Sequence, residues 1–224
     1  MNADLQALYA RAKECYDHRA SMEDVRLAQM LFRELGDYER SADYVGKCDL
    51  LLKYELGNFV AFGRHNGAPI CWKVVAERGR MRLLLAEDAL FCAPYNGVLV
   101  DMNWAFCTLR RTLNERFLKS CFTPAEQALI SVTRNENPRN PTYFTAGGPI
   151  TLDKIFLFSQ EEAERILPDP EQRSNGDWWW LRSPGSNLLS AMAVYADGSV
   201  YVPGIHIVSD RCGVRPALWR LLRV

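Results

Sequence analysis

The segment AMAVYADGSVYV, residues 191–202, is the strongest structural signal in the chain. Its centre, Asp197-Gly198, is a dipeptide typical of the tight turn of a β-hairpin, and alternating residues flank it on both sides. Because successive strand residues face opposite sides, one parity is expected to point into the core: Met192, Val194, Val200 and Val202. The other parity is expected to point outward: Ala193, Tyr195, Ser199 and Tyr201.

Outward from this hairpin, residues 57–224 predict one domain of the α+β class. Short β-branched and aromatic runs separated by turn residues predict an antiparallel meander at 59–63, 70–77 and 81–87. Apolar residues at helical spacing predict a helix over 104–122, and Thr123 followed by Pro and Glu opens another. The remaining elements are expected to be an irregular loop at 133–150, a strand around 155–158 and a short helix from Gln160. A sheet with helices inserted among its strands is α+β.

Residues 1–55 have a different texture and predict a small bundle of three helices. Ser21 can cap the second helix and Gly36 can end it. The third apolar stripe comprises Tyr38, Ala42, Val45, Cys48, Leu51 and Leu52. The segment resembles the helix-turn-helix of tetratricopeptide-like repeats, in one copy. We therefore expect these helices to dock on the rest of the chain, on a partner or on a second copy of the chain.

Composition excludes several functional classes. The 224 residues carry 27 basic and 27 acidic side chains, so no global basic field favours nucleic acid. No apolar run is long enough to span a membrane, and the first residues lack the apolar core of a signal peptide. The seven scattered cysteines are better read as reduced thiols, so we expect a cytoplasmic protein. Display on a cell or virion surface by another route stays open.

No constellation of residues predicts an enzyme. Hydrolase and phosphate-loop motifs are missing, and none of the cysteines has a histidine at a useful offset. We expect no cofactor and no metal ion, because histidine ligands are scattered and one Glu136-Asn137-Pro138 tripeptide is too little for calcium. Trp178-Trp179-Trp180 could stack against a sugar, but adjacent strand residues cannot all face one way, so at least one should be core.

Several motifs resemble the bacterial DUF6273 family over residues 57–222. The most specific are WWWLRSPG at 178–185, DGSV at 197–200 and GVRPALW at 213–219. Further matching runs are WKVV at 72–75, LLLAE at 83–87, PYN at 94–96, TLRRTLN at 108–114 and DKIFL at 153–157. The resemblance implies a C-type-lectin-like fold of the formylglycine-generating-enzyme type. The helices of residues 1–55 precede this domain and lie outside the resemblance.

That fold implies two different functions. An oxidase that makes formylglycine needs two reactive cysteines near the domain's end, and only Cys212 is present there. The alternative is ligand binding, as in the variable proteins of diversity-generating retroelements from bacteria and prophages. Their randomised AAY codons cannot encode Lys, Glu, Gln, Met or Trp, and residues 186–211 contain none of these types except Met192. This composition favours the variable-protein interpretation.

We therefore expect a non-enzymatic protein that binds a protein or another macromolecule through its C-terminal face. The expected binding residues are Ser186, Asn187, Leu188, Leu189, Ser190, Ala193, Tyr195, Ala196, Ser199, Tyr201, Pro203, Ile205, His206, Ser209, Asp210 and Arg211. Segments 186–190 and 205–211 are expected to be loops, and 178–182 and 214–219 rigid walls. Arg182 and Arg215 are interpreted as structural, because buried arginines usually pair with carbonyls or acids. The alternatives are the oxidase and an adaptor acting through residues 1–55.

Overall fold

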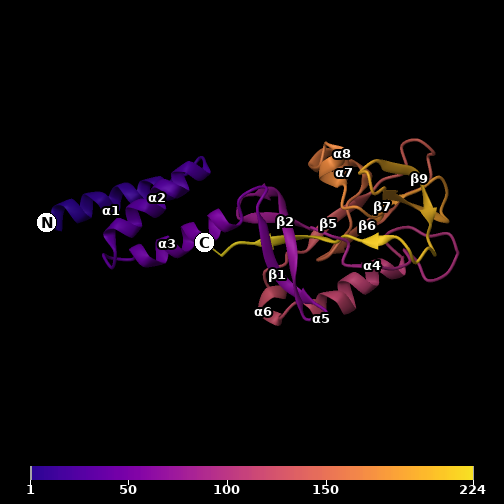
Figure 1. Ribbon diagram of the computed structural model, residues 1–224, viewed down its shortest axis with the longest axis horizontal. Coiled ribbons are helices and arrows are strands. Elements are labelled where there is room, and N and C mark those ends of the chain that lie inside the picture. The colour runs from indigo at the N-terminus through magenta and orange to yellow at the C-terminus, as the bar shows by residue number, and fades with distance from the viewer. Residues whose placement is uncertain (1, 224) are drawn as a thin grey trace. The chain divides into compact units, whose positions relative to one another are not determined.

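The computed structural model describes residues 2–223 and divides into two compact units (Figure 1). The first unit runs from the N-terminus to Val60 and includes the residues from Leu222 onward; the second is Ala61–Leu221. Among residues 2–223, no helix is both long enough and apolar enough to cross a bilayer.

The first unit contains the three expected helices: α1 (Asn2–Asp17), α2 (Met22–Leu35) and α3 (Ser41–Lys53). Ser21 and Asp24 form a capping box at the start of α2, and Gly36 follows its end with a φ of 56°. The third stripe was partly wrong, since Ala42 is exposed. Tyr44 takes its place and stacks on the Phe32 ring at 4.7 Å between centroids.

The second unit begins with a four-stranded sheet in the order β1-β2-β3-β11. Its strands are β1 (Phe59–His65), β2 (Ala68–Arg78), β3 (Met81–Ala86) and β11 (Ala217–Leu221). The expected meander is thus confirmed, and β11 closes the sheet by pairing antiparallel with β3. The expected strand around 155–158 is wrong: Phe156 makes one isolated bridge to Ala217, and residues 155–158 are buried as core instead.

A five-stranded sheet in the order β4-β10-β7-β8-β9 carries the C-terminal hairpin. Its strands are β4 (Phe91–Cys92), β7 (Trp179–Pro184), β8 (Ser190–Val194), β9 (Val200–His206) and β10 (Gly213–Val214). The loop expected at 133–150 is corrected at both ends, because β5 (Thr133–Asn137) and β6 (Gly148–Asp153) pair there as a two-stranded ribbon.

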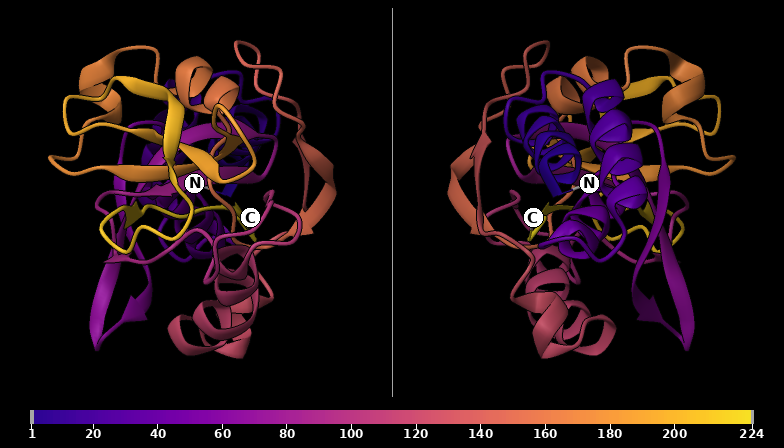
Figure 2. Two further views of the ribbon diagram at one scale, coloured as in Figure 1. Left: turned by 90° about the vertical axis from the view of Figure 1, so that its right-hand side faces the viewer. Right: turned by 90° about the vertical axis from the view of Figure 1, so that its left-hand side faces the viewer.

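Helices surround these sheets. The expected 104–122 helix begins later, as the continuous run α4 (Thr108–Thr112), η1 (Leu113–Phe117, a π-helical turn) and α5 (Leu118–Cys121). Short helices follow at α6 (Pro124–Gln127), α7 (Gln160–Ile166) and α8 (Pro170–Arg173). Figure 2 shows α4–α5 and the β5–β6 ribbon on different sides of the β7–β9 strands. The mixed helix-and-sheet architecture confirms the α+β class.

Candidate functional site

The predicted binding residues gather on the β8–β9 hairpin and the segments beside it. Strands β8 and β9 pair antiparallel, with Ala193 opposite Tyr201 and Val194 opposite Val200. Gly198 forms the expected turn with a φ of 85°. Since β9 is the outer strand of its sheet, the hairpin lies at an edge that other molecules can reach.

Most of the predicted residues keep part of their surface accessible. Four are exposed: Asn187, His206, Asp210 and Arg211. Ten are half-buried: Ser186, Leu188, Leu189, Tyr195, Ala196, Ser199, Tyr201, Pro203, Ile205 and Ser209. Of the apolar-aromatic patch expected from Leu188, Leu189, Tyr195, Tyr201, Ile205 and His206, only His206 is exposed and the other five side chains are half-buried.

Two predicted residues are wrong, because Ser190 is 7% and Ala193 is 0% exposed. Their strand β8 is an inner strand, and its residues 190–194 are buried on both faces. Alternating residues differ in exposure only when one face of a strand is buried and the other meets solvent. The rule therefore fails for β8, where both faces are buried. The loops are also shorter than expected, since Ile205 and His206 belong to β9 and Ser190 belongs to β8.

A row of aromatic rings runs along the accessible side of the hairpin. Tyr195 and Tyr201 stack at 4.9 Å, and the ring of Trp178 meets Tyr195 edge-on at 4.3 Å. Trp178 is 43% exposed, whereas Trp179 and Trp180 are fully buried. The expectation that part of this block is core is confirmed, but Trp178 was wrongly placed among the rigid walls. It belongs to the accessible face.

A pocket of about 370 Å³ opens next to this row. Its lining combines three predicted residues with three others: Ile205, Ser209 and Arg211 with Asp177, Trp178 and Cys212. Thus part of the lining comes from the end of β9 and the segment after it, and part from the two residues just before β7. Sequence reasoning missed Asp177, and it considered Trp178 as a possible sugar-stacking residue but assigned it to a wall.

The hairpin turn is anchored by hydrogen bonds from the C-terminal end of α8. The Arg173 guanidinium donates from Nε to the Gly198 carbonyl at 2.8 Å, and the Ser174 hydroxyl donates to the Ala196 carbonyl at 2.6 Å. Within the turn, the Ser199 hydroxyl donates to the Asp197 carboxylate at 2.7 Å and lowers the pKa of that carboxyl. The turn is therefore held in one geometry without any ligand.

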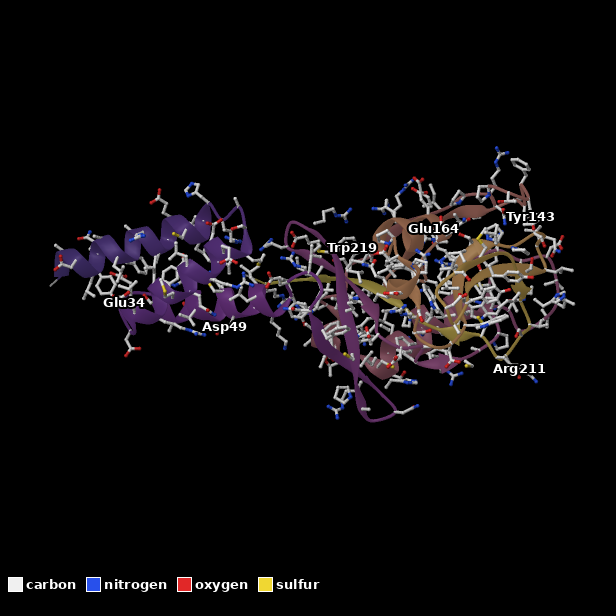
Figure 3. All side chains as sticks on the ribbon, turned by 45° about the horizontal axis from the view of Figure 1, so that its top comes forward. Glu34, Asp49, Tyr143, Glu164, Arg211 and Trp219 are labelled. Atoms are coloured by element: carbon white, nitrogen blue, oxygen red, sulfur yellow. The ribbon has the colours of Figure 1, made fainter. Side chains whose placement is uncertain are left out.

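The opposite end of the hairpin is fastened by one buried side chain. The Asn140 amide donates to the carbonyls of Pro184 and Gly185, each at 3.0 Å, and to that of Val202 at 3.3 Å. Asn140 lies in the loop between β5 and β6, whose Tyr143 is seen toward the same end of the unit as Arg211 (Figure 3). This loop therefore fixes where β7 ends beside β9.

Another loop, residues 96–106, adds apolar surface that the sequence did not suggest. The Met102 N–H donates to the Leu188 carbonyl at 2.9 Å, which joins this loop to the predicted site. Nearby in sequence, Val98 is 60%, Leu99 is 51% and Val100 is 48% exposed. The signal that could have found them is three consecutive apolar residues directly after Asn96-Gly97.

The arginines of the walls are structural, as expected. Arg182 is 4% exposed, pairs with the Glu162 carboxylate and donates to the Leu157 carbonyl at 2.8 Å. Arg215 donates from Nε to the Ala86 carbonyl at 2.8 Å, and burial lowers its pKa to about 10. Both guanidinium groups are bonded to buried groups of the fold, and neither arginine lines the pocket.

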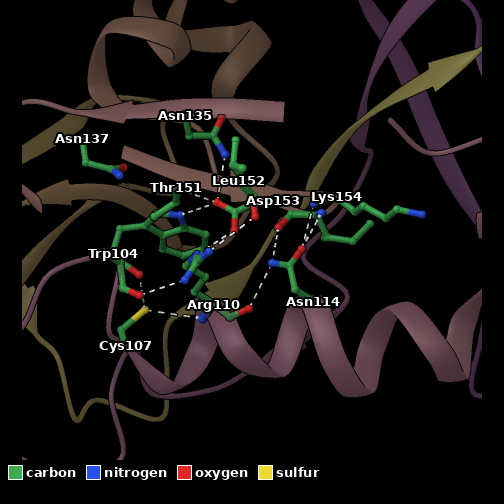
Figure 4. A network of polar contacts seen from close by, with 12 residues as sticks. Trp104, Cys107, Arg110, Asn114, Asn135, Asn137, Thr151, Leu152, Asp153 and Lys154 are labelled. Atoms are coloured by element: carbon green, nitrogen blue, oxygen red, sulfur yellow. Dashed lines mark hydrogen bonds and ion pairs between the residues drawn. The ribbon is translucent and has the colours of Figure 1, made fainter. Parts of the chain in front are cut away.

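A second buried network explains several motif residues far from the hairpin (Figure 4). Asp153 is 1% exposed and accepts hydrogen bonds from the Trp104 indole at 3.1 Å and the Thr151 hydroxyl at 2.7 Å. Arg110 pairs with the same carboxylate at 2.6 Å, and the Asn114 amide donates to the Ile155 carbonyl at 2.8 Å. These contacts tie α4 and η1 to β6, so the residues hold the fold together.

The cysteine near the end of the domain is buried, and Cys92 on the paired strand β4 lies near it. All seven are free, and Cys212 is 2% exposed. Burial raises the pKa of its thiol far above the ordinary value, which disfavours the nucleophilic thiolate. Across residues 2–223, no three His, Cys, Asp or Glu side chains gather into a group that could hold a metal ion.

Comparison with known families agrees with the motifs from residue 83 onward, whereas WKVV at 72–75 and the rest of the expected coverage before residue 80 lie outside the match. A family model described as a domain of unknown function, DUF6273, matches residues 80–220, which is more than half of the chain. No curated protein and no solved structure matches the chain at a significant level. The match includes the buried network, the pocket and strands β7 to β11 apart from Leu221, the last residue of β11. The chain is a member of the DUF6273 family.

Proposed function

We propose that this chain is a non-enzymatic binding protein whose C-terminal face engages a macromolecular ligand. One observation supports the proposal above the others. Strands β7 and β8 are buried throughout, and this rigid framework carries the accessible row of Trp178, Tyr195 and Tyr201 beside a pocket. Partly exposed aromatic side chains on a preformed surface are the common anchors of protein interfaces.

The finer parts of the proposal are a C-type-lectin-like fold and a variable face of the retroelement type. Their support is the composition of residues 186–211 together with the accessibility of all but two of the predicted positions. Met192 is the one residue in this segment that a randomised AAY codon cannot encode, and it is fully buried in β8. A framework that keeps such residues inside can vary the side chains outside without loss of the fold.

The neighbouring DNA tests the variable face. We expect a reverse transcriptase gene and a near-duplicate of the segment coding for residues 186–211, with adenines at the codons of the accessible positions. A flanking sequence with neither feature would refute the retroelement interpretation and leave the binding proposal standing.

Peptide display tests the binding face itself. A random peptide library is selected on the immobilised full chain, and the recovered clones are measured against a variant with Tyr195, Tyr201 and His206 all changed to Ala. We expect affinity to fall at least about tenfold, or ~1.4 kcal/mol. Tyr143→Ala, which removes another exposed tyrosine, serves as the control and should leave affinity unchanged. Clones that bind the triple variant as tightly as the wild type would refute the site.

The adaptor alternative makes the opposite prediction. If the helices of residues 1–55 provide the binding surface, the recovered clones should be insensitive to the triple substitution and sensitive to changes at exposed positions of α1 and α3. The same clones therefore decide between the two surfaces.

A further inference from the structure

The pocket beside Trp178 holds two unpaired charges of opposite sign. Asp177 and Arg211 both line it, and both are exposed. Within residues 2–223, neither side chain makes an ion pair or a hydrogen bond, with the other or with any neighbour. Their carboxylate and guanidinium are thus free to meet a ligand.

The aromatic wall of the pocket is fixed in position. Trp178 lines the pocket and also meets Tyr195 at 4.3 Å, and Tyr195 in turn stacks on Tyr201. This chain of contacts holds the indole while leaving 43% of Trp178 accessible. An indole face held in this way offers a flat apolar surface against which C–H groups can stack.

The charges limit what the pocket can accept. The guanidinium of Arg211 would repel a cationic ligand in the pocket, and the carboxylate of Asp177 would repel an anionic one. A neutral ligand rich in hydroxyl groups uses both, because each hydroxyl can donate to the carboxylate and accept from the guanidinium. The Ser209 hydroxyl, also in the lining, can do either.

The size of the pocket narrows the class further. Its volume of about 370 Å³ lies at the small end of the ~300–1,000 Å³ typical of ligand sites. One six-membered ring suits that space, and a long oligomer does not. A ring that has an apolar C–H face and hydroxyl groups around its edge is a pyranose.

We propose that this pocket binds a single neutral sugar ring, stacked on Trp178 and hydrogen-bonded by Asp177, Ser209 and Arg211. The inference rests on the proposed function, since it names the chemical class that the same face recognises on its ligand. In this proposal Trp178 stacks against the sugar ring, and the carboxylate of Asp177 and the guanidinium of Arg211 determine which hydroxyl positions are recognised.

Saturation-transfer NMR and calorimetry on the full chain test the proposal. The probes are the methyl pyranosides of glucose, galactose, mannose and N-acetylglucosamine. We expect at least one to bind with magnetisation transfer to its ring C–H protons. Trp178→Ala should weaken that binding at least about tenfold, while Trp178→Phe, which keeps an aromatic face, should stay within about threefold. Asp177→Ala and Arg211→Ala should each change which pyranoside binds best.

Phe144→Ala is the matched control, since it removes an aromatic ring that is 65% exposed and outside the pocket. Binding of none of the four pyranosides, or equal binding by Trp178→Ala, would overturn the sugar assignment. Tighter binding of zwitterionic glycine betaine, of the tetramethylammonium cation or of the acetate anion would overturn it as well. In each of these outcomes the peptide clones would still report on the binding face, so failure here is distinguishable from failure of the proposed function.

Discussion

Replacement of Ala193 by Asn tests the burial of the hairpin framework most directly. Ala193 is 0% exposed and lies opposite Trp180 on one side and Tyr201 on the other. The larger side chain must fit into a packed strand, which costs ~1–3 kcal/mol. Its amide has no partner there, which costs another ~1–3 kcal/mol. We expect a loss of ~2–6 kcal/mol, a large share of the ~5–15 kcal/mol that stabilises a typical domain.

Urea unfolding followed by tryptophan fluorescence measures this loss. All six tryptophans lie within Ala61–Leu221, so their emission reports on the second unit. With a urea dependence of ~2 kcal/mol per molar, the unfolding midpoint should fall by ~1–3 M. His206→Asn is the matched control, because His206 is exposed at the end of the same hairpin and should change stability by less than ~0.5 kcal/mol.

Equal midpoints for the two variants would show that position 193 is open and that the burial argument is wrong. The result also bears on the variable face, since Asn is the residue that an unmutated AAY codon encodes. If Ala193→Asn unfolds the second unit, a template repeat of this segment must spare codon 193.

Three other substitutions probe the supports of the site. Gly198→Ala should destabilise the hairpin by ~2 kcal/mol or more in urea titrations, because its Cβ would lie 1.8 Å from the Pro170 carbonyl oxygen at a φ of 85°; unchanged stability would refute the close approach. Asp197→Asn should lower the thermal midpoint at pH 6 but not at pH 2.5. The Ser199 hydrogen bond lowers the folded pKa, so its contribution is present above about pH 4 and lost as the pH falls. A difference that persists in acid would contradict this. Asn140→Ala should cost ~2–4 kcal/mol, since it leaves buried carbonyls without a donor; a midpoint shift under about 0.3 M would contradict it.

The fold was predictable where local chemistry and tertiary structure agree. Strands β1, β2 and β3 carry β-branched and aromatic runs between clear turns. The Asp197-Gly198 dipeptide strongly favours a tight hairpin turn. Strands β5 and β6 were missed because their segment is rich in Asn, Pro and Gly. They form because Asn135 and Thr151 reach the buried Asp153, a long-range contact that no local pattern announces.

The candidate site was predictable in position but not in detail. The outer strand β9 shows no alternation, because Val200 to Ile205 are all half-buried; Tyr201 is accessible as expected, but the core positions predicted for Val200 and Val202 are wrong. Strand β8 is covered on both faces, and so Ala193 is buried. Trp178 could not be separated from Trp179 and Trp180 by sequence, since all three are the same residue type. Only the sheet order, with β10 beside the start of β7, decides which indole reaches the surface.

The amide that fastens β7 to β9 has a consequence for chemical ageing. Asparagine loses its amide when the backbone nitrogen of the next residue attacks the side chain, and that nitrogen must carry a hydrogen. After Asn140 comes Pro141, whose nitrogen carries none, so this route is closed at the fastening point. Asn66-Gly67, in the exposed turn between β1 and β2, has no such protection. Asn175-Gly176, just before the pocket residues Asp177 and Trp178, is not protected either. Stored protein should therefore acquire new negative charge at these two Asn-Gly turns, while the Asn140 amide that fastens β7 to β9 is retained.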